Sequence, residues 1–308
     1  MSQAPGDGRE LAGSFPPLIT PFRDALLDLD AYERLVERQV ALGSHGIVVN
    51  GTSAQPSALT VAERKQLLEI ALTTVAGRLP VVAATGAGSH AETVELTMHA
   101  ERAGADAVLI VTPYYVRPSQ RGLVAYFSDL GRRIGLPMLL YHIPGRAAVS
   151  LEVETVLRIA DQAPNLAGIK HAAADLGFVS RLLARLGPGF RIFVGLEELS
   201  FPMLCLGAAG LMNAVGNLAP EPVAALWRAV TAGDLEAGRR LHYQLLELNQ
   251  AVFWDTNPVP VKYLMRRLGL LDRDEHRLPL LPASAETAGR LDELLHRQQW
   301  IVPAAAAS

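Results

Sequence analysis

The stretch Leu166-Ala167-Gly168-Ile169-Lys170-His171-Ala172 predicts a short buried strand that ends in a lysine. Apolar and small residues flank Lys170, so we expect its amine to be poorly hydrated. Desolvation disfavours the charged form of an amine, and a neutral amine can attack a carbonyl carbon to form a Schiff base. A lysine at a strand end more commonly keeps its head in solvent, because buried lysines are uncommon. Other stretches of the chain decide between the two interpretations.

Short apolar runs like this one recur along the chain, and amphipathic segments separate them. Continuous apolar strands that alternate with helices are typical of a parallel sheet covered on both faces. The predicted strands are residues 17–22, 46–50, 79–84, 106–111, 137–141, 166–170, 191–195 and 210–215. Eight such units favour a (β/α)8 TIM barrel over an open doubly wound sheet. The open sheet remains the alternative, but it would want a glycine-rich turn after the first strand, and residues 18–23 have none.

The predicted domain organisation is one barrel with a C-terminal helical extension. Residues 1–12 combine Gly, Pro and charge without periodicity, and we expect them to be disordered. Residues 13–220 form the barrel, residues 221–302 form helices packed on it, and residues 303–308 form a frayed tail. No compositional linker separates the barrel from these helices.

Two helix starts are marked in the sequence. Asp30 is expected to cap the first long helix, and Thr60 opens the next one with Glu63 three residues on, as in a capping box.

The composition excludes several classes of protein. The chain has 308 residues, of which 50% are hydrophobic and 19% charged, which is typical of a globular protein with a sizeable core. A net charge of -3 without a basic patch argues against nucleic-acid binding. Cys205 is the only cysteine, so no disulfide framework or thiolate metal site is expected, and its apolar surroundings predict a core residue. No apolar run of about 18 residues and no signal segment occur, so we expect a cytoplasmic protein that binds no membrane.

The active site of such a barrel lies at the carboxyl ends of its strands. The residues expected there are Thr52, Ser53, Thr112, Tyr114, Tyr115, Tyr141, His142, Arg146, Lys170, His171, Gly195 and Glu197. This set suits Schiff-base chemistry, since Lys170 can attack a ketone while the Tyr141 phenol carries protons. Hydroxyls at Thr52 and Tyr115 could relay those protons to solvent.

Two further features of this rim suit carboxylates. Backbone N–H groups at Thr52 and Ser53 could hold one carboxylate, and Arg146 could grip a second one bidentately. Each residue taken alone is more commonly a turn, loop or surface residue. Their coincidence on one rim favours an active site.

Rival chemistries find less support. The eight histidines are dispersed without an H-x-x-x-H pair, so no metal site is expected. His142 and His171 directly follow Tyr141 and Lys170, and strand alternation points them away from the barrel interior. No G-x-S-x-G motif supports a serine hydrolase.

The chain also resembles the dihydrodipicolinate synthase / N-acetylneuraminate lyase family of class I, pyruvate-handling lyases, from about residue 17 to residue 282. The motifs that carry the resemblance are Thr20-Pro21-Phe22, Gly51-Thr52-Ser53, Val111-Thr112-Pro113-Tyr114-Tyr115, Tyr141-His142-Ile143-Pro144-Gly145-Arg146, Gly168-Ile169-Lys170 and Asn257-Pro258-Val259-Pro260-Val261-Lys262. Their order and spacing together are highly specific. The resemblance implies a (β/α)8 barrel with a C-terminal helical segment.

The resemblance also implies catalytic roles for four residues. Lys170 matches the Schiff-base lysine and Tyr141 the proton donor and acceptor. Thr52 and Tyr115 match the rest of a hydroxyl relay. In relatives the tyrosine that matches Tyr115 comes from a neighbouring subunit across a tight dimer, usually within a homotetramer that is a dimer of dimers.

Substrate-binding positions follow in the same way. Ser53 and the backbone near Met212 match positions that hold pyruvate, and Gly195 is placed with them. Arg146 matches the arginine that binds the carboxylate of the aldehyde substrate. No metal and no cofactor are implied beyond the covalent imine between pyruvate and Lys170.

Several residues depart from the family pattern. Ala54-Gln55 stands where the motif after the second strand usually ends in Gly-Glu. Val61, Arg64 and Gly88 occupy positions that hold histidines and an asparagine in lysine-inhibited synthases, so feedback inhibition by lysine is not expected. His142 replaces a common asparagine.

The leading functional hypothesis is a Schiff-base lyase like 4-hydroxy-tetrahydrodipicolinate synthase, which joins pyruvate to a carboxylate-bearing aldehyde. The run Gly195-Leu196-Glu197-Glu198-Leu199 also resembles a catabolic subset that cleaves 2,4-dihydroxyhept-2-enedioate into pyruvate and succinate semialdehyde. That catabolic aldolase is the alternative within enzymes. The alternative of another class is a non-catalytic barrel that binds a keto acid.

Overall fold

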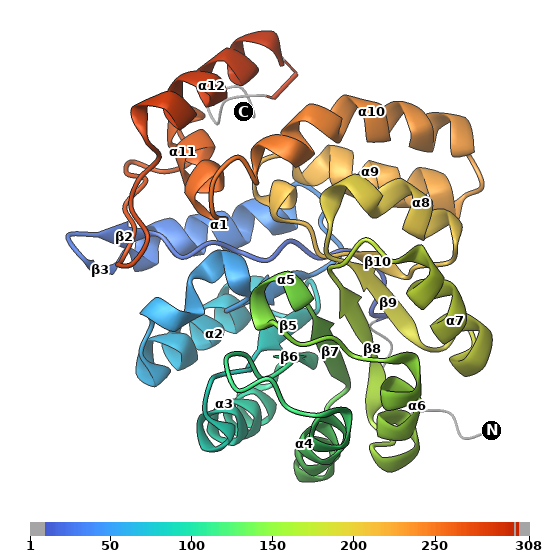
Figure 1. The fold of residues 1–308 in the computed structure, drawn as a ribbon. Coiled ribbons are helices and arrows are strands. Elements are labelled where there is room, and N and C mark those ends of the chain that lie inside the picture. The colour runs from blue at the N-terminus through green and yellow to red at the C-terminus, as the bar shows by residue number, and fades with distance from the viewer. Residues whose placement is uncertain (1–9, 299, 302–308) are drawn as a thin grey trace.

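The computed structural model describes residues 10–298 and 300–301, and these form a barrel of parallel strands within a ring of helices (Figure 1). The barrel strands are β1 (Gly13–Ser14), β4 (Ile47–Val49), β5 (Val81–Ala84), β6 (Ala107–Val111), β7 (Met138–His142), β8 (Leu166–His171), β9 (Arg191–Val194) and β10 (Gly210–Leu211). They lie in the order β1-β10-β9-β8-β7-β6-β5-β4. Backbone bonds from Leu18 N to Val48 O (2.9 Å) and from Val48 N to Pro16 O (3.0 Å) connect the two ends of this sheet. The predicted eight-stranded barrel is therefore confirmed.

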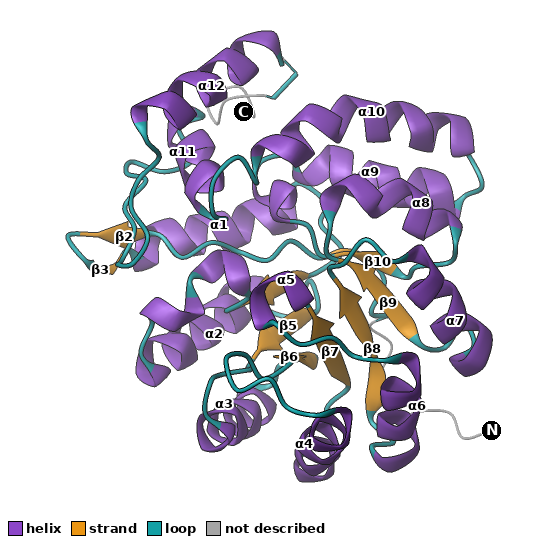
Figure 2. Ribbon diagram, viewed as in Figure 1, coloured by secondary structure: helices purple, strands orange, loops and turns teal. Residues whose placement is uncertain are grey.

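Helices follow the strands and cover the outside of the barrel, as Figure 2 shows. They are α1 (Leu29–Ala41), α2 (Val61–Val75), α3 (His90–Ala103), α4 (Gln120–Arg133), the short α5 (Pro144–Ala147), α6 (Val153–Gln162), α7 (Leu176–Leu186) and α8 (Ser200–Cys205). Short 3-10 turns η1 (Thr52–Ala54), η2 (Pro56–Ala58), η3 (Glu197–Leu199) and η4 (Ala214–Asn217) follow three of the strands. The capping box of Thr60 and Glu63 opens α2 as predicted. Asp28, not Asp30, caps α1, because its side chain accepts from Ala31 N.

The first strand differs from its prediction. The barrel strand is β1, at Gly13–Ser14, whereas β2 (Phe22–Arg23) pairs antiparallel with β3 (Leu26–Leu27) in a hairpin outside the barrel. Pro16 and Pro17 have no N–H to donate to a ladder, so the extended chain after Ser14 keeps only an isolated bridge between Pro17 and Val48. The apolar run at residues 17–22 therefore predicted a barrel strand where the structure has only extended chain and the start of a hairpin.

The described N-terminal residues also differ from the prediction of disorder. Leu11 is buried inside the barrel, and Glu10 forms a 2.9 Å ion pair with Arg191. Residues 1–9 and the tail 303–308 lie outside the described residues. Cys205 ends α8 and is exposed, so the prediction of a core cysteine was wrong.

The C-terminal helices are α9 (Pro220–Thr231), α10 (Leu235–Ala251), α11 (Val259–Arg267) and α12 (Ala285–Arg297), and they pack on the β10 end and α1 side of the barrel (Figure 1). The Trp227 indole donates to Ala209 O at 2.9 Å. The fully buried Lys262 ammonium donates to Glu275 O at 2.6 Å and lies 4.3 Å from the centre of the Phe22 ring. These contacts hold the extension against the barrel. Among the described residues, no helix combines the length and apolarity needed to cross a membrane.

Two apolar clusters make up the core. The larger lies between strands and helices, and the smaller fills the barrel interior, where Phe15 packs edge to face on Phe193 at 5.3 Å. Side chains alternate between the two, since Leu109 points inward and Val108 and Ile110 point outward. Tyr141 packs against this interior apolar cluster.

Candidate active site

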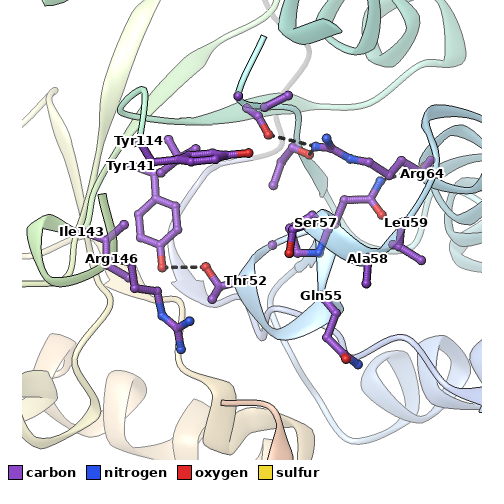
Figure 3. Close-up of a pocket in the computed structure, with 18 of the residues that line it drawn as sticks. Thr52, Gln55, Ser57, Ala58, Leu59, Arg64, Tyr114, Tyr141, Ile143 and Arg146 are labelled. Carbon is purple, nitrogen blue, oxygen red and sulfur yellow. Dashed lines mark hydrogen bonds between the residues drawn. The ribbon is translucent and has the colours of Figure 1, made fainter. Parts of the chain in front are cut away.

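A cavity of about 670 Å³ lies at the carboxyl ends of the strands. Its lining includes Thr52, Tyr141, Arg146 and Asn257. Figure 3 shows Tyr141 and Arg146 on one side of this cavity and Arg64 on the other. Polar side chains therefore converge where the barrel geometry predicts an active site.

Lys170 and Tyr141 face each other on neighbouring strands. Their backbones are directly paired in the register of β8 and β7, and the Lys170 Nζ lies 4.4 Å from the centre of the Tyr141 ring. Lys170 is only 3% exposed. The predicted burial of this lysine and its nearness to a phenol are both present.

Gly195 makes room for the Lys170 side chain. A Cβ added at Gly195 would lie 2.9 Å from Lys170 Cε and 2.9 Å from the Ala172 Cβ, closer than real contacts allow. Gly195 N also donates to His171 O at 2.8 Å, which fixes the end of β9 beside β8. A side chain at Gly195 would displace the lysine stem.

Thr52 joins the pair through a hydrogen bond. Its Oγ1 lies 3.2 Å from the Tyr141 hydroxyl, and either atom can donate (Figure 3). The residue sits at the start of η1, directly after β4, so the turn brings its side chain over the barrel. Two of the three predicted relay hydroxyls are therefore in contact.

Tyr115 does not join them within this chain. Its side chain is 93% exposed and its backbone is left-handed, with φ at +72°, whereas its neighbour Tyr114 lines the cavity. The Tyr115 hydroxyl is therefore not part of the contact between Thr52 and Tyr141 within this chain, and its left-handed backbone is uncommon for a tyrosine.

Ser53 and Arg146 meet through a residue from the C-terminal extension. Asn257 Nδ2 donates to Ser53 Oγ at 3.1 Å, and Arg146 Nη2 donates to Asn257 O at 3.4 Å. The Arg146 guanidinium has no ion-pair partner among the described residues, so it can take a carboxylate from a ligand. Met212 is buried in the barrel interior, and its N–H donates to Val194 O at 2.8 Å.

Asn257 was not among the predicted site residues. Its motif was noticed in the sequence, but it lies 204 residues from Ser53, and nothing local predicts that the extension returns to the strand ends.

Three of the residues that depart from the family pattern, Gln55, Arg64 and Gly88, line the cavity. Gln55 is 4% exposed and left-handed, and neither amide atom has a partner among the described residues. The buried Arg64 guanidinium donates to Ala84 O (3.1 Å) and Gly86 O (3.2 Å) and lies 3.4 Å from Glu92. Burial lowers the pKa of Arg64, and the Glu92 charge opposes this shift. The Arg64 side chain therefore lines the cavity and is held there by its contacts with Ala84, Gly86 and Glu92.

His142 and His171 lie outside the barrel interior, as alternation predicted. Their Nδ1 atoms are 3.1 Å apart, and the His171 ring stacks on Phe178 of α7 at 4.8 Å. The Leu151 N–H donates to His142 Nε2 at 3.2 Å, so a neutral His142 carries its proton on Nδ1 and donates it to His171. Burial first, and the His171 charge second, lower the pKa of His142 to about 4. The pair is thus neutral at pH 7 and packs between the barrel strands and α7.

Comparison with known proteins agrees across sequence and structure. A family model described as the dihydrodipicolinate synthetase family matches residues 10–298. A 4-hydroxy-tetrahydrodipicolinate synthase of Thermus thermophilus is 46% identical over 286 residues, which cover 92% of this chain and 95% of the relative. One of Syntrophobacter fumaroxidans is 38% identical over 91% of this chain and 96% of its own. The crystal structure of dihydrodipicolinate synthase from Aquifex aeolicus superposes with a TM-score of 0.92 at 36% identity, over 95% of this chain and 99% of that one.

Proposed function

The chain belongs to the dihydrodipicolinate synthetase family, and from this premise we propose that it is a lyase of the 4-hydroxy-tetrahydrodipicolinate synthase type. It joins pyruvate to a carboxylate-bearing aldehyde through a Schiff base on Lys170. The observation that carries the proposal is the buried Lys170 amine 4.4 Å from the centre of the Tyr141 ring, with the Tyr141 hydroxyl 3.2 Å from Thr52.

The first half of the reaction activates pyruvate. The Lys170 nitrogen bonds to the ketone carbon, and the ketone oxygen takes up two protons and leaves as water. The Tyr141 hydroxyl donates to that oxygen and recovers its proton through Thr52. The resulting iminium draws electrons from the methyl group, whose carbon loses a proton to the relay of Tyr141 and Thr52, and an enamine forms.

The second half forms the carbon–carbon bond. The enamine carbon attacks the aldehyde carbon, the aldehyde oxygen takes up a proton and becomes a hydroxyl, and the iminium on Lys170 forms again. Water then adds to this iminium carbon, the bond to the Lys170 nitrogen breaks, and the ketone product leaves with the amine restored. Arg146 binds the carboxylate of the aldehyde with two parallel N–H bonds, and Asn257 O holds the guanidinium in place. Orientation of the aldehyde by Arg146 converts a bimolecular step into one between bound partners.

Pyruvate is held by the backbone around the lysine. We assign its carboxylate to Ser53 and to the main chain near Met212, with Gly195 leaving room for the imine. The iminium formed between Lys170 and pyruvate accepts the electrons that the reaction moves, so we propose that no further cofactor or metal takes part.

A second copy of the chain completes the site in this proposal. Tyr115 is too exposed to act within its own subunit, and across a tight dimer its hydroxyl would extend the relay of Thr52 and Tyr141 in the neighbour. We propose a homotetramer built as a dimer of such dimers, located in the cytoplasm.

Neither alternative is favoured by the comparisons. The two relatives reported above carry the synthase name, which gives no support to the catabolic aldolase. A non-catalytic keto-acid-binding barrel would not need the contact of Lys170, Tyr141 and Thr52 that this chain keeps.

The test is a substrate screen. Purified protein and pyruvate are offered aspartate semialdehyde and succinate semialdehyde in parallel, and the loss of pyruvate is followed. We expect a clear preference for aspartate semialdehyde. A preference for succinate semialdehyde would overturn the synthase assignment while leaving the Schiff-base chemistry in place.

A further inference from the structure

A buried carboxyl group two residues beyond Gly195, which packs against Lys170, has no part in the reaction as described above. Glu197 begins η3, directly after β9, and is only 2% exposed. Burying a carboxylate without a partner costs free energy, so a compensating charge or hydrogen bond is expected near it. Among the described residues no Lys, Arg or His side chain forms an ion pair with it.

The Glu197 side chain is fixed by one short hydrogen bond. Its Oε1 accepts from Ala214 N at 2.6 Å, while its Oε2 is buried and has no partner among the described residues. Its own carbonyl accepts from Asn249 Nδ2 of α10 at 3.4 Å. The carboxyl group therefore connects the loop after β9 to the loop after β10 through Oε1, and Oε2 accepts no hydrogen bond from the described residues.

These two loops flank the lysine on the side opposite Tyr141. The strand order places β8 between β7, which carries Tyr141, and β9, which ends next to Gly195. Gly195 packs against Lys170 Cε, and it lies two residues before Glu197. Ala214 lies two residues after Met212, where the keto acid is assigned. The hydrogen bond of Glu197 thus sets the spacing of the backbone on which the imine would rest.

The electrostatics of the group depend on the lysine. Burial raises the pKa of Glu197 to about 7, while nearby backbone N–H groups, Ala214 first, and then the positive charge of Lys170 pull this pKa back down. Lys170 is the charged side chain that lowers the pKa of Glu197. A positive charge at the lysine nitrogen therefore favours the carboxylate, and a neutral nitrogen favours the acid.

We propose that Glu197 is a positioning residue that holds the backbone of the keto-acid site and supplies the negative charge that stabilises the iminium on Lys170. The iminium carries a positive charge in a dry site, where a nearby carboxylate interacts far more strongly than it would in water. This inference rests on the proposed Schiff-base function.

The test separates charge from shape. Glu197→Gln keeps an oxygen that can accept from Ala214 N and removes the charge. The matched control is Glu198→Gln, the same change one residue along at an exposed carboxylate that accepts from Gln250 Nε2 at 2.7 Å. We expect Glu197→Gln to lower kcat on the order of tenfold or more with little change in the KM of pyruvate, because the transition to a cationic intermediate loses its counter-charge. Glu198→Gln should match the wild type.

The pH profile is the readout that a merely structural role would not move. In the wild type kcat/KM for pyruvate should fall as the pH drops below about 7, as the Glu197 carboxylate becomes protonated. Glu197→Gln should lose this limb of the profile. A variant with wild-type kcat and a wild-type profile would overturn the inference.

A measurement that leaves Glu197 unchanged keeps the inference testable if Glu197→Gln does not fold. At a pH just below 7, the infrared band of a protonated carboxyl group should be stronger in Lys170→Ala, which has no positive charge at this position, than in the wild type saturated with pyruvate, where the iminium carries one. Equal bands in the two proteins, with a wild type that does trap pyruvate, would overturn the inference alone. A wild type that fails to trap pyruvate at all would overturn the proposed function instead.

Discussion

Lys170 and Tyr141 stand opposite each other in the register of two adjacent parallel strands, and the lysine Nζ lies 4.4 Å from the centre of the tyrosine ring. Because strand pairing places both side chains on the same face of the sheet, the proposed nucleophile and the proposed proton carrier are positioned by the backbone of two strands rather than by a loop. A site on paired strands is held with little freedom, which favours a reaction that needs a defined angle of attack.

The first prediction concerns the nucleophile. Lys170→Ala should abolish trapping of pyruvate by borohydride, measured as a mass increase of the intact protein. Tyr141→Phe should still trap pyruvate but turn over on the order of 10²-fold or more slowly, because it loses the proton carrier and keeps the amine. Trapping that persists in Lys170→Ala would show that another amine is the nucleophile.

The second prediction concerns the space beside the lysine. Gly195→Ala places a Cβ 2.9 Å from Lys170 Cε, so the amine must move and the rate of pyruvate trapping should fall at least about tenfold. The matched control is Gly189→Ala, since a Cβ at Gly189 meets nothing within 4 Å. Equal trapping rates in the two variants would mean that the lysine stem adapts freely.

The third prediction concerns the histidine pair behind the site. The folded pKa of His142, about 4, lies below the ordinary value of 6.5, so the stability that the neutral ring contributes is complete above about pH 6.5 and is lost as the pH falls toward 4. Protonation of His142 would also place a hydrogen on Nε2, the atom that accepts from the Leu151 N–H in the neutral ring. We expect the free energy of unfolding to drop by on the order of 1–3 kcal/mol between pH 7 and pH 4.5, as judged from each pKa unit being worth about 1.4 kcal/mol.

Urea unfolding at both pH values measures this loss. His142→Asn cannot be protonated, so its pH-dependent drop should be smaller than that of the wild type. A variant with the full drop would assign the acid lability to other groups.

The fourth prediction concerns recognition of the aldehyde. Arg146→Ala should raise the KM of the aldehyde on the order of 10²-fold, since it removes a bidentate charge-assisted contact. Pyruvate trapping should stay near the wild-type rate, because among the described residues the Arg146 guanidinium bonds to Asn257 O and not to Lys170. Steady-state kinetics with the aldehyde as the varied substrate, alongside trapping, distinguish the two effects. Unchanged aldehyde kinetics would remove Arg146 from the site.

Much of this site could be predicted from the sequence, because its parts follow apolar strands closely. Lys170, Tyr141 and Thr52 stand at or just past strand ends, so the barrel pattern alone brings them to one rim. Asn257 could not be found this way, since the path of the C-terminal extension depends on packing of distant helices. The first strand was misplaced because an apolar run with prolines looks like a strand but cannot complete a ladder.

The buried carboxyl of Glu197 shows a second limit. Its position after a strand was visible in the sequence, but its charge state depends on burial and on Lys170, which only the packed structure reveals. Tyr115 shows a third, since its side chain is 93% exposed and the role proposed for it depends on contacts with a second copy of the chain.

The fifth prediction tests that boundary directly. If Tyr115 serves the neighbouring subunit, Lys170→Ala and Tyr115→Phe chains should each be impaired alone and should complement each other when mixed. In a mixed dimer the subunit that keeps Lys170 receives an intact Tyr115 from the other chain, so one of its two sites holds a full set of residues.

Unfolding and refolding of the two variants together at equal concentration produces such dimers. Random pairing makes about half of them mixed, and with one complete site each they should restore about a quarter of wild-type turnover. Mixing without refolding controls for contamination by wild-type protein. If Tyr115 instead acted within its own subunit, every site in a mixed dimer would lack one of the two residues. Activity would then stay at the average of the two parents, whatever the mixing ratio.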